Sequence, residues 1–297
     1  MRPGDRIGRG IALSASAFAC FSVADAAVKW LTAGYSVFQI SMLAALFAMV
    51  PIGVLVARSG GAAVLRPRHP GTVAAIAILL LIDTVTIYYA FSRLPLANVY
   101  IFVFAPPLII TALTPVLLKE PVGWHRWAAV LGGFLGILVI LRPGLVPMDI
   151  GYLSAAVAAL TFALALILIR RLGEGEADGT IVFWSFIAKI VGPGAVAVFA
   201  FTPMPAADVG IMALAGVFVG LAHIFLTQAF KRAPGPVVAP FQYTQMPWAV
   251  LLGFLLFGDR PDAWVIGGSA LVAAAGLYIL WREQIVGRRA SPSTGSG

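Results

Sequence analysis

The chain has 297 residues, of which 61% are hydrophobic and only 11% charged, and its mean hydropathy is +0.97. A water-soluble domain of this length cannot bury so much apolar surface, so the composition excludes a soluble enzyme and predicts a membrane protein. The formal net charge of +8 does not indicate a nucleic-acid partner, because the basic residues are spread over many connecting segments instead of one patch.

Apolar stretches predict an all-α membrane protein with ten transmembrane helices. A bilayer core about 30 Å thick requires roughly 20 helical residues. Suitable stretches lie near residues 10–31, 36–57, 72–92, 96–118, 124–141, 150–170, 180–201, 208–230, 235–257 and 263–281. Residues 1–9 form a short N-terminal segment, and we expect residues 282–297 to be a disordered tail. The connecting segments leave no room for a soluble catalytic domain.

The basic residues predict the orientation of these helices. If the N-terminus is cytoplasmic, fifteen Lys and Arg residues lie on the cytoplasmic side and only Arg93, Arg142 and Arg260 on the other. The positive-inside rule therefore places both termini in the cytoplasm, and the Arg-, Ala- and Gly-rich composition favours a bacterial inner membrane. The single cysteine, Cys20, excludes an internal disulfide, and we expect no metal or other cofactor.

The sequence also repeats itself at an offset of about 140 residues. AFSRLP at 90–95 recurs as AFKRAP at 229–234, and LSA at 13–15 recurs at 153–155. We therefore predict two five-helix units, residues 10–141 and 150–281. Because five is an odd number, the second unit must be inverted in the membrane, which is typical of carriers that work by alternating access. A duplication with purely structural consequences is the alternative.

Two long runs carry a resemblance to a known family. They are YYAFSRLPLANVYIFVFAPPLIITALTPVLLKEPVGWHRWAAVLGGFLGILVILRPG from Tyr88 and AFKRAPGPVVAPFQYTQMPW…LLFGDRPDAW from Ala229. These runs resemble the third-to-fifth and eighth-to-tenth helices of the drug/metabolite transporter superfamily, in its ten-helix EamA branch. The resemblance implies a secondary transporter, with amino-acid export as the leading expectation because the branch includes bacterial amino-acid exporters. A carrier of nucleosides, sugars or vitamins is the alternative, and a channel or an intramembrane enzyme is less favoured. Many members have an arginine in the second helix, whereas residues 40–49 contain none.

Prolines predict a substrate site between the fourth and ninth helices. Pro106 and Pro107 interrupt the fourth, and Pro240 and Pro247 interrupt the ninth, so each break frees backbone carbonyls that need a neighbour or a cavity. A packed kink is the alternative. The polar and aromatic residues nearby that we predict to bind substrate are Asn98, Tyr100, Gln242, Tyr243, Gln245 and Trp248.

Ionisable residues at membrane depth extend this predicted site, because such groups are costly there and commonly functional. The further residues that we predict to bind substrate are Ser22, Asp25, Asp83, Tyr88 and His223. Lys29 and Lys189 are candidate charge partners: Lys29 follows Asp25 by four residues, as in a structural ion pair, and Lys189 could meet Asp83, Asp25 or a substrate carboxylate. Proton coupling through Asp83 or His223 is a further hypothesis. We expect the small-molecule substrate and the lipid bilayer as partners, with monomer and homodimer both open.

Overall fold

A computed structural model describes residues 3–58, 61–117, 123–141, 149–172, 175–232 and 239–290, and every secondary-structure element in these ranges is helical. The elements are α1 (Pro3–Leu31), α2 (Val37–Arg58), η1 (Gly61–Leu65), α3 (Pro70–Arg93), α4 (Leu96–Val103), α5 (Pro106–Leu117), α6 (Trp124–Leu141), α7 (Ile150–Leu172), α8 (Asp178–Ala197), η3 (Val198–Ala200), α9 (Ala206–Arg232), η4 (Ala239–Thr244), α11 (Gln245–Phe257) and α12 (Ala263–Ala290). Helices are the expected solution in lipid, because they satisfy their own backbone hydrogen bonds.

The described helices include seven stretches that are long and apolar enough to cross a membrane, one of them the interrupted stretch from Leu96 to Leu113. Two further apolar segments, Trp127–Val139 and Ala263–Ala275, are shorter. The described helices overlap all ten predicted ranges. The prediction of a multi-pass, all-helical membrane protein is therefore confirmed, and ten crossings remain a prediction.

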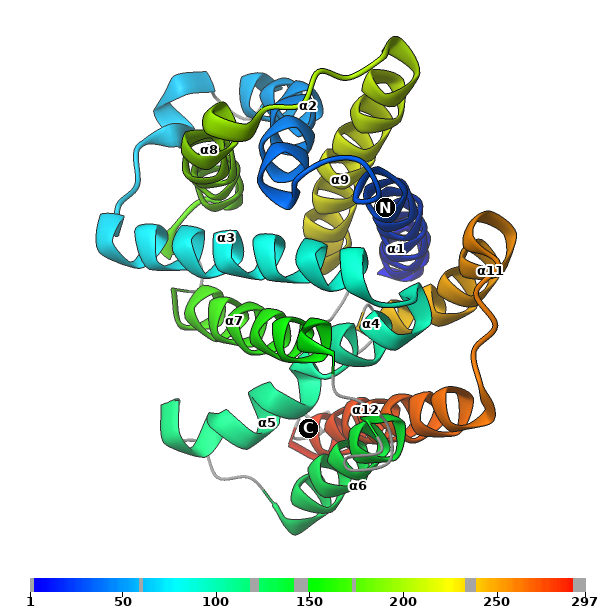
Figure 1. The fold of residues 1–297 in the computed structure, drawn as a ribbon. Helices are drawn as coiled ribbons and strands as arrows, with labels where there is room; N and C mark the ends of the chain where they lie inside the picture. The colour runs from blue at the N-terminus through cyan, green and yellow to red at the C-terminus, as the bar shows by residue number, and fades with distance from the viewer. Residues whose placement is uncertain are drawn as a thin grey trace.

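The helices form a bundle around α3 and α7, which run side by side in its middle (Figure 1). On one side of α3 lie α8, α2, α9 and α1, where α2 packs on both α8 and α9, and α9 packs on α1. On the other side of α7 lie α5, α6 and α12. The middle of the bundle is thus built from one helix of each predicted five-helix unit.

The helix pairings are symmetric under exchange of the two units. Matching pairs are α1–α9 with α7–α3, α2–α9 with α8–α3, and α1–α11 with α7–α5, while α2–α8 and α6–α12 each pair equivalent helices. A pseudo-two-fold axis between two five-helix units generates this pattern.

Two helices are interrupted at equivalent places. The fourth predicted span is divided into α4 and α5 at Phe104–Ala105, directly before Pro106. The ninth begins, in its described part, as the 3-10 helix η4 and becomes the α-helix α11 only at Gln245. These positions differ by the repeat offset of about 140 residues. The break in the fourth helix lies at the predicted prolines, because proline removes a backbone donor from the helix. In the ninth, Pro240 lies within η4 and Pro247 within α11, and the change from 3-10 to α-helix falls between them.

Small residues allow the long helices to approach closely. A Cβ atom on Gly216 of α9 would lie 2.5 Å from the Ala44 carbonyl oxygen of α2, and one on Gly136 of α6 would lie 2.8 Å from the Gly268 carbonyl oxygen of α12. Gly136 thus packs one predicted unit against the other, in agreement with a packing role for this glycine.

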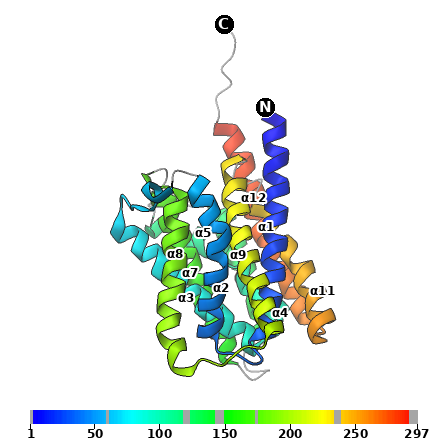
Figure 2. The same cartoon turned by 90° about the horizontal axis from the view of Figure 1, so that it is seen from above.

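Both ends of the chain depart from the predicted boundaries. α1 begins at Pro3, and α12 continues to Ala290, so residues 282–290 of the expected tail belong to a helix; residues 291–297 lie outside the described part. A helix that is already formed propagates easily through good helix formers such as those of this segment. The first turns of α1 and the last turns of α12 lie at the same end of the bundle (Figure 2). We call the opposite end, where α1 and α11 finish, the far end.

Candidate functional site

The two interrupted helices meet at a backbone group that a proline leaves free. Pro107 has no N–H to donate to the Val103 carbonyl, four residues earlier in the chain. The side chain of Gln242, in η4, donates from Nε2 to that carbonyl oxygen at 3.0 Å. In this structure Gln242 thus supplies the donor that Pro107 lacks, and its predicted contact with substrate stays a prediction.

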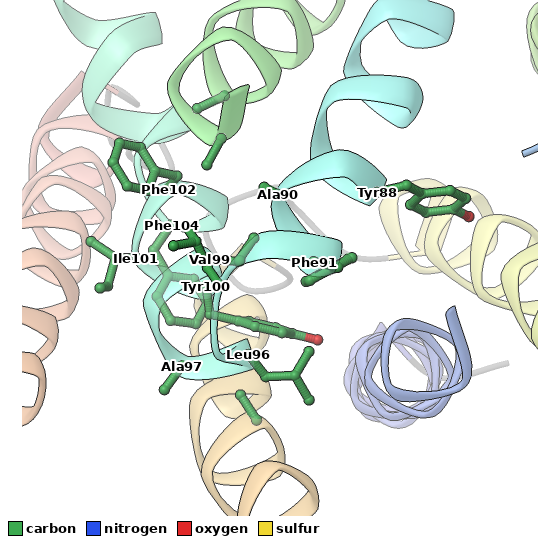
Figure 3. Packing of buried hydrophobic residues seen from close by; sticks show 14 of the residues in the cluster. Tyr88, Ala90, Phe91, Leu96, Ala97, Val99, Tyr100, Ile101, Phe102 and Phe104 are labelled. Atoms are coloured by element: carbon green, nitrogen blue, oxygen red, sulfur yellow. The ribbon is translucent and has the colours of Figure 1, made fainter. Parts of the chain in front are cut away.

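A carboxylate of α1 faces the first of these helices. The Tyr100 hydroxyl of α4 donates to Asp25 Oδ2 at 2.6 Å, and Figure 3 shows this hydroxyl directed toward α1. The side chains of Ser22 and Gln245 also approach the Tyr100 hydroxyl closely enough to interact with it. All but Asp25 are almost completely buried, with 1–3% exposure. Four predicted site residues from α1, α4 and α11 are therefore brought together.

A second group of ionisable residues adjoins this one. Asp83 of α3 interacts electrostatically with both Lys189 of α8 and Asp25, and Tyr88 interacts with both carboxylates. Lys189 is only 6% exposed. Opposite charges offset part of the cost of placing each in a low-dielectric interior. Lys189 and Asp83 thus attract each other between α8 and α3 without forming an ion pair within 4.0 Å, and their part in a substrate site stays a prediction.

His223 of α9 lies between two aromatic rings beside Lys189. The centroids of Phe21 and Phe186 are 5.1 and 5.2 Å from its ring, both in edge-on geometry. Its Nδ1 is 2.8 Å from the Val219 carbonyl oxygen, and since a carbonyl only accepts, Nδ1 carries a proton. The Nε2 atom of the neutral ring is then an acceptor. The Lys189 ammonium, which interacts with His223, lies 4.9 Å from the Phe186 centroid.

Aromatic rings connect the two interrupted helices. Centroid distances are 6.4 Å for Phe91–Tyr100, 5.9 Å for Tyr100–Phe104 and 5.2 Å for Phe104–Tyr243. The first three rings are fully buried and belong to the packed core (Figure 3). Tyr243 is partly exposed, yet its hydroxyl is buried and has no hydrogen-bond partner among the described residues. This hydroxyl is therefore a buried polar group that the described residues leave unsatisfied.

Other predicted site residues have different surroundings. Asn98 donates from Nδ2 to the Tyr152 hydroxyl at 2.8 Å, which ties α4 to α7. Trp248 is 41% exposed and Pro247 is also exposed, as expected for residues facing lipid. Pro106 is buried and Pro107 half-buried, whereas the side chain of Pro240 lies outside the described part.

The predicted alternative of a structural Asp25–Lys29 ion pair is not formed. Asp25 accepts from Tyr100, and the Lys29 ammonium donates to the Leu94 carbonyl oxygen at 2.7 Å. The two side chains share a helix face in sequence, but each is hydrogen-bonded to a group outside its own helix.

Equivalent contacts tie the two units together at both ends of the bundle. At the far end the Tyr35 hydroxyl donates to Asp208 Oδ2 at 2.5 Å, and this hydrogen bond raises the pKa of Tyr35. At the other end Glu176 Oε2 accepts from the backbone N–H groups of Arg68 and His69 at 2.7 and 3.1 Å. Residues 35 and 176, and likewise 68 and 208, are separated by about the repeat offset.

Sequence reasoning missed several of these residues. The Tyr152 hydroxyl accepts a hydrogen bond from Asn98, and the Phe186 ring packs edge-on against His223. Gln39 forms two hydrogen bonds with the backbone of Thr202, at 2.7 and 2.9 Å. Phe186 could have been found, since it lies three residues before Lys189 on the same helix face. Gln39 gives no such signal, because its partner is a connecting segment remote in sequence.

Comparison with known proteins shows two copies of one family pattern. The EamA-like transporter family matches residues 8–142 and again residues 149–282. These matches coincide with the two predicted units to within two residues at each boundary and confirm the two-repeat fold.

Two of the similar proteins are named for the metabolite that they transport. A riboflavin transporter of Rhizobium johnstonii is 28% identical over 224 residues, which cover 75% of this chain and 74% of the relative. An S-adenosylmethionine uptake transporter of Rickettsia prowazekii is 22% identical over 263 residues, 89% of each protein. A crystal structure of another protein aligns with a TM-score of 0.67 at 18% identity over 95% of this chain and 99% of that one, which shows a shared fold.

Proposed function

Because this chain belongs to the EamA-like transporter family, we propose that it is a secondary carrier that moves an amphipathic metabolite with a planar ring across a bacterial inner membrane. One observation carries the proposal: Asp25, Asp83, Lys189, His223 and the Tyr100 hydroxyl converge from five helices next to the two interrupted ones. Ionisable groups are costly at this depth unless they pair with one another or line a substrate path.

The substrate class follows from the chemistry of this site and from the relatives. The partly exposed Tyr243 ring, whose buried hydroxyl has no partner among the described residues, suits a flat heterocycle that carries hydrogen-bonding groups. Riboflavin and S-adenosylmethionine, which name the relatives' activities, both contain such a ring. A vitamin- or nucleoside-like metabolite therefore replaces an amino acid as our leading proposal.

An amino acid is the second candidate because the site has both signs of charge. The carboxylate of Asp83 suits an ammonium group, and Lys189 suits a carboxylate. S-adenosylmethionine contains both a ring and an amino-acid moiety, so it tests the two ideas together.

The repeated architecture supports alternating access. Two similar units in opposite orientations provide two similar conformations, one open to each side of the membrane. The shared end of α1 and α12 is placed in the cytoplasm, because fifteen Lys and Arg residues lie on that side in the predicted topology. The far end is then periplasmic.

The test is transport into and out of liposomes that contain the purified protein. Riboflavin, S-adenosylmethionine and phenylalanine are supplied in turn, with and without a proton gradient. We expect saturable flux of one of the two heterocycles, and a loss of at least tenfold in Asp83→Asn and Lys189→Met. Asp149→Asn is the matched control, since it changes an acid that pairs with Arg93 on the surface, 3.1 Å away.

Two results would reject parts of the proposal. Saturable flux of phenylalanine alone would favour the amino-acid class. Flux that never saturates, or that is unchanged in both site variants while they remain folded, would exclude a carrier using this site.

A further inference from the structure

Lys29 sits at the far end of α1, where it caps another helix. Its Nζ donates to the carbonyl oxygen of Leu94 at 2.7 Å. Leu94 is the C-terminal cap of α3, and Pro95 follows as the first residue of the turn into α4. A positive charge is favourable at a helix C-terminus, where carbonyl groups lack helical partners. Lys29 therefore holds the joint between α3 and the interrupted fourth helix.

The same ammonium group also faces α11 of the other repeat. It lies 5.1 Å from the centroid of the Phe257 ring, and the Trp30 ring lies 6.3 Å from that ring. Asp259, two residues beyond α11, interacts electrostatically with Lys29, although the two do not form an ion pair within 4.0 Å. Lys29 is thus close to a carboxylate that it does not touch.

The chain turns back at the end of α11 to bring this carboxylate inward. Gly258 has a φ of 70°, a left-handed conformation that glycine adopts without steric cost. The Asp259 N–H then donates to the Gly253 carbonyl at 3.0 Å, and a Cβ on Gly253 would lie 3.6 Å from Asp259 Oδ2 and 4.0 Å from Leu96. Asp259 is therefore folded over α11, on the side that packs against the start of α4.

One oxygen of the Asp259 carboxylate has no hydrogen-bond partner among the described residues in this position. Its Oδ2 is buried and accepts no hydrogen bond from the described residues. A buried carboxylate oxygen without a partner is unfavourable. A displacement of α11 toward α1 would bring this oxygen closer to the Lys29 ammonium, which donates to the Leu94 carbonyl in this structure.

We propose that Lys29 is a switch at the far end that exchanges between the Leu94 carbonyl and the Asp259 carboxylate. The exchange connects the α3–α4 joint of the first repeat with α11 of the second. One position of Lys29 holds the fourth helix, and the other draws the ninth helix onto α1. This inference rests on the alternating-access mechanism proposed above, and it does not depend on which metabolite is carried.

The test measures the separation of α1 and α11 directly, with the full chain in liposomes. Spin labels are attached to Ala33→Cys, just after α1, and Leu256→Cys, on α11, in a Cys20→Ala background; both labelled positions are exposed. We expect two distance populations by pulsed electron resonance. Lys29→Met and Asp259→Asn should each lose the same population, and the double variant should change no more than either single one.

Two further variants serve as controls. Lys29→Arg keeps the charge and should retain both populations. Arg93→Met removes a cation at the same end that pairs with Asp149 instead of α11, and it should also retain both. If Lys29→Met fails to fold, Asp259→Asn alone decides the question.

The proposal is overturned by a single population in the starting protein, by unchanged distances in Asp259→Asn, or by additive effects of the two variants. The measurement needs no substrate. The distances can therefore be interpreted even if the transport assay fails. Intact transport together with unchanged distances would reject the switch but not the proposed function.

Discussion

Removal of the buried hydroxyl should have different effects on protein stability at Tyr100 and at Tyr243, two members of the same row of aromatic rings. The Tyr100 hydroxyl donates to Asp25 at 2.6 Å, whereas the Tyr243 hydroxyl has no partner among the described residues. Phenylalanine keeps both rings and their contacts, so Tyr100→Phe and Tyr243→Phe each remove only an oxygen. The pair therefore separates the contribution of a hydrogen bond from that of ring packing.

The expected magnitudes follow from the partners. Hydrogen bonds to charged groups contribute about 1.5–3 kcal/mol in water-soluble proteins, and those within membranes average about 0.6 and reach about 1.7 kcal/mol. We expect Tyr100→Phe to lower the free energy of unfolding by about 1.5 kcal/mol, which corresponds to a decrease in Tm of roughly 3–6 °C for a chain of this size. Tyr243→Phe should leave Tm unchanged or raise it, because it removes an unpartnered buried hydroxyl.

Thermal unfolding in one detergent, followed by circular dichroism, measures both variants against the starting protein. Transport adds a second contrast: Tyr243→Phe should slow transport without loss of stability if its hydroxyl binds substrate. Equal losses of Tm in both variants, or no loss in Tyr100→Phe, would refute the reasoning from hydrogen-bond partners.

Gly216→Leu should reduce folding yield and Tm, since a Cβ at this position would lie 2.5 Å from the Ala44 carbonyl of α2, whereas the same change at Gly210, which has no neighbour within 4 Å, should not. Glu176→Gln tests a pH dependence outside the membrane: burial acts to raise the pKa of Glu176, but hydrogen bonds from the backbone N–H groups of His69 and two neighbours outweigh it and hold the pKa below its ordinary value. A lowered pKa means that the stabilisation is present above the unfolded-state pKa of about 4.3 and is lost as the pH falls through the folded-state value. Tm measured from pH 7 to pH 3 should therefore fall less steeply in Glu176→Gln than in the starting protein, and parallel curves would contradict this role.

The fold was largely predictable because lipid imposes simple constraints. Long apolar stretches must be helical in a bilayer, and a 140-residue repeat with an odd number of helices implies that the two units are inverted. Pro106 also marked the break in the fourth helix correctly, because a missing N–H acts locally whatever surrounds it. The end of α12 was misplaced, since helix propagation beyond the apolar stretch is not encoded in hydropathy.

The sequence by itself determined which groups are costly in the membrane, and it therefore identified Asp25, Asp83, Lys189 and His223 as a set that needs partners. Only the tertiary structure decided which residues those partners are. Asp25 pairs with Tyr100 on another helix instead of with Lys29 on its own, and Gln242 satisfies a carbonyl 139 residues away. Periodicity places a side chain on a helix face, but its partner depends on which helices lie opposite, and that is set by packing between segments remote in sequence.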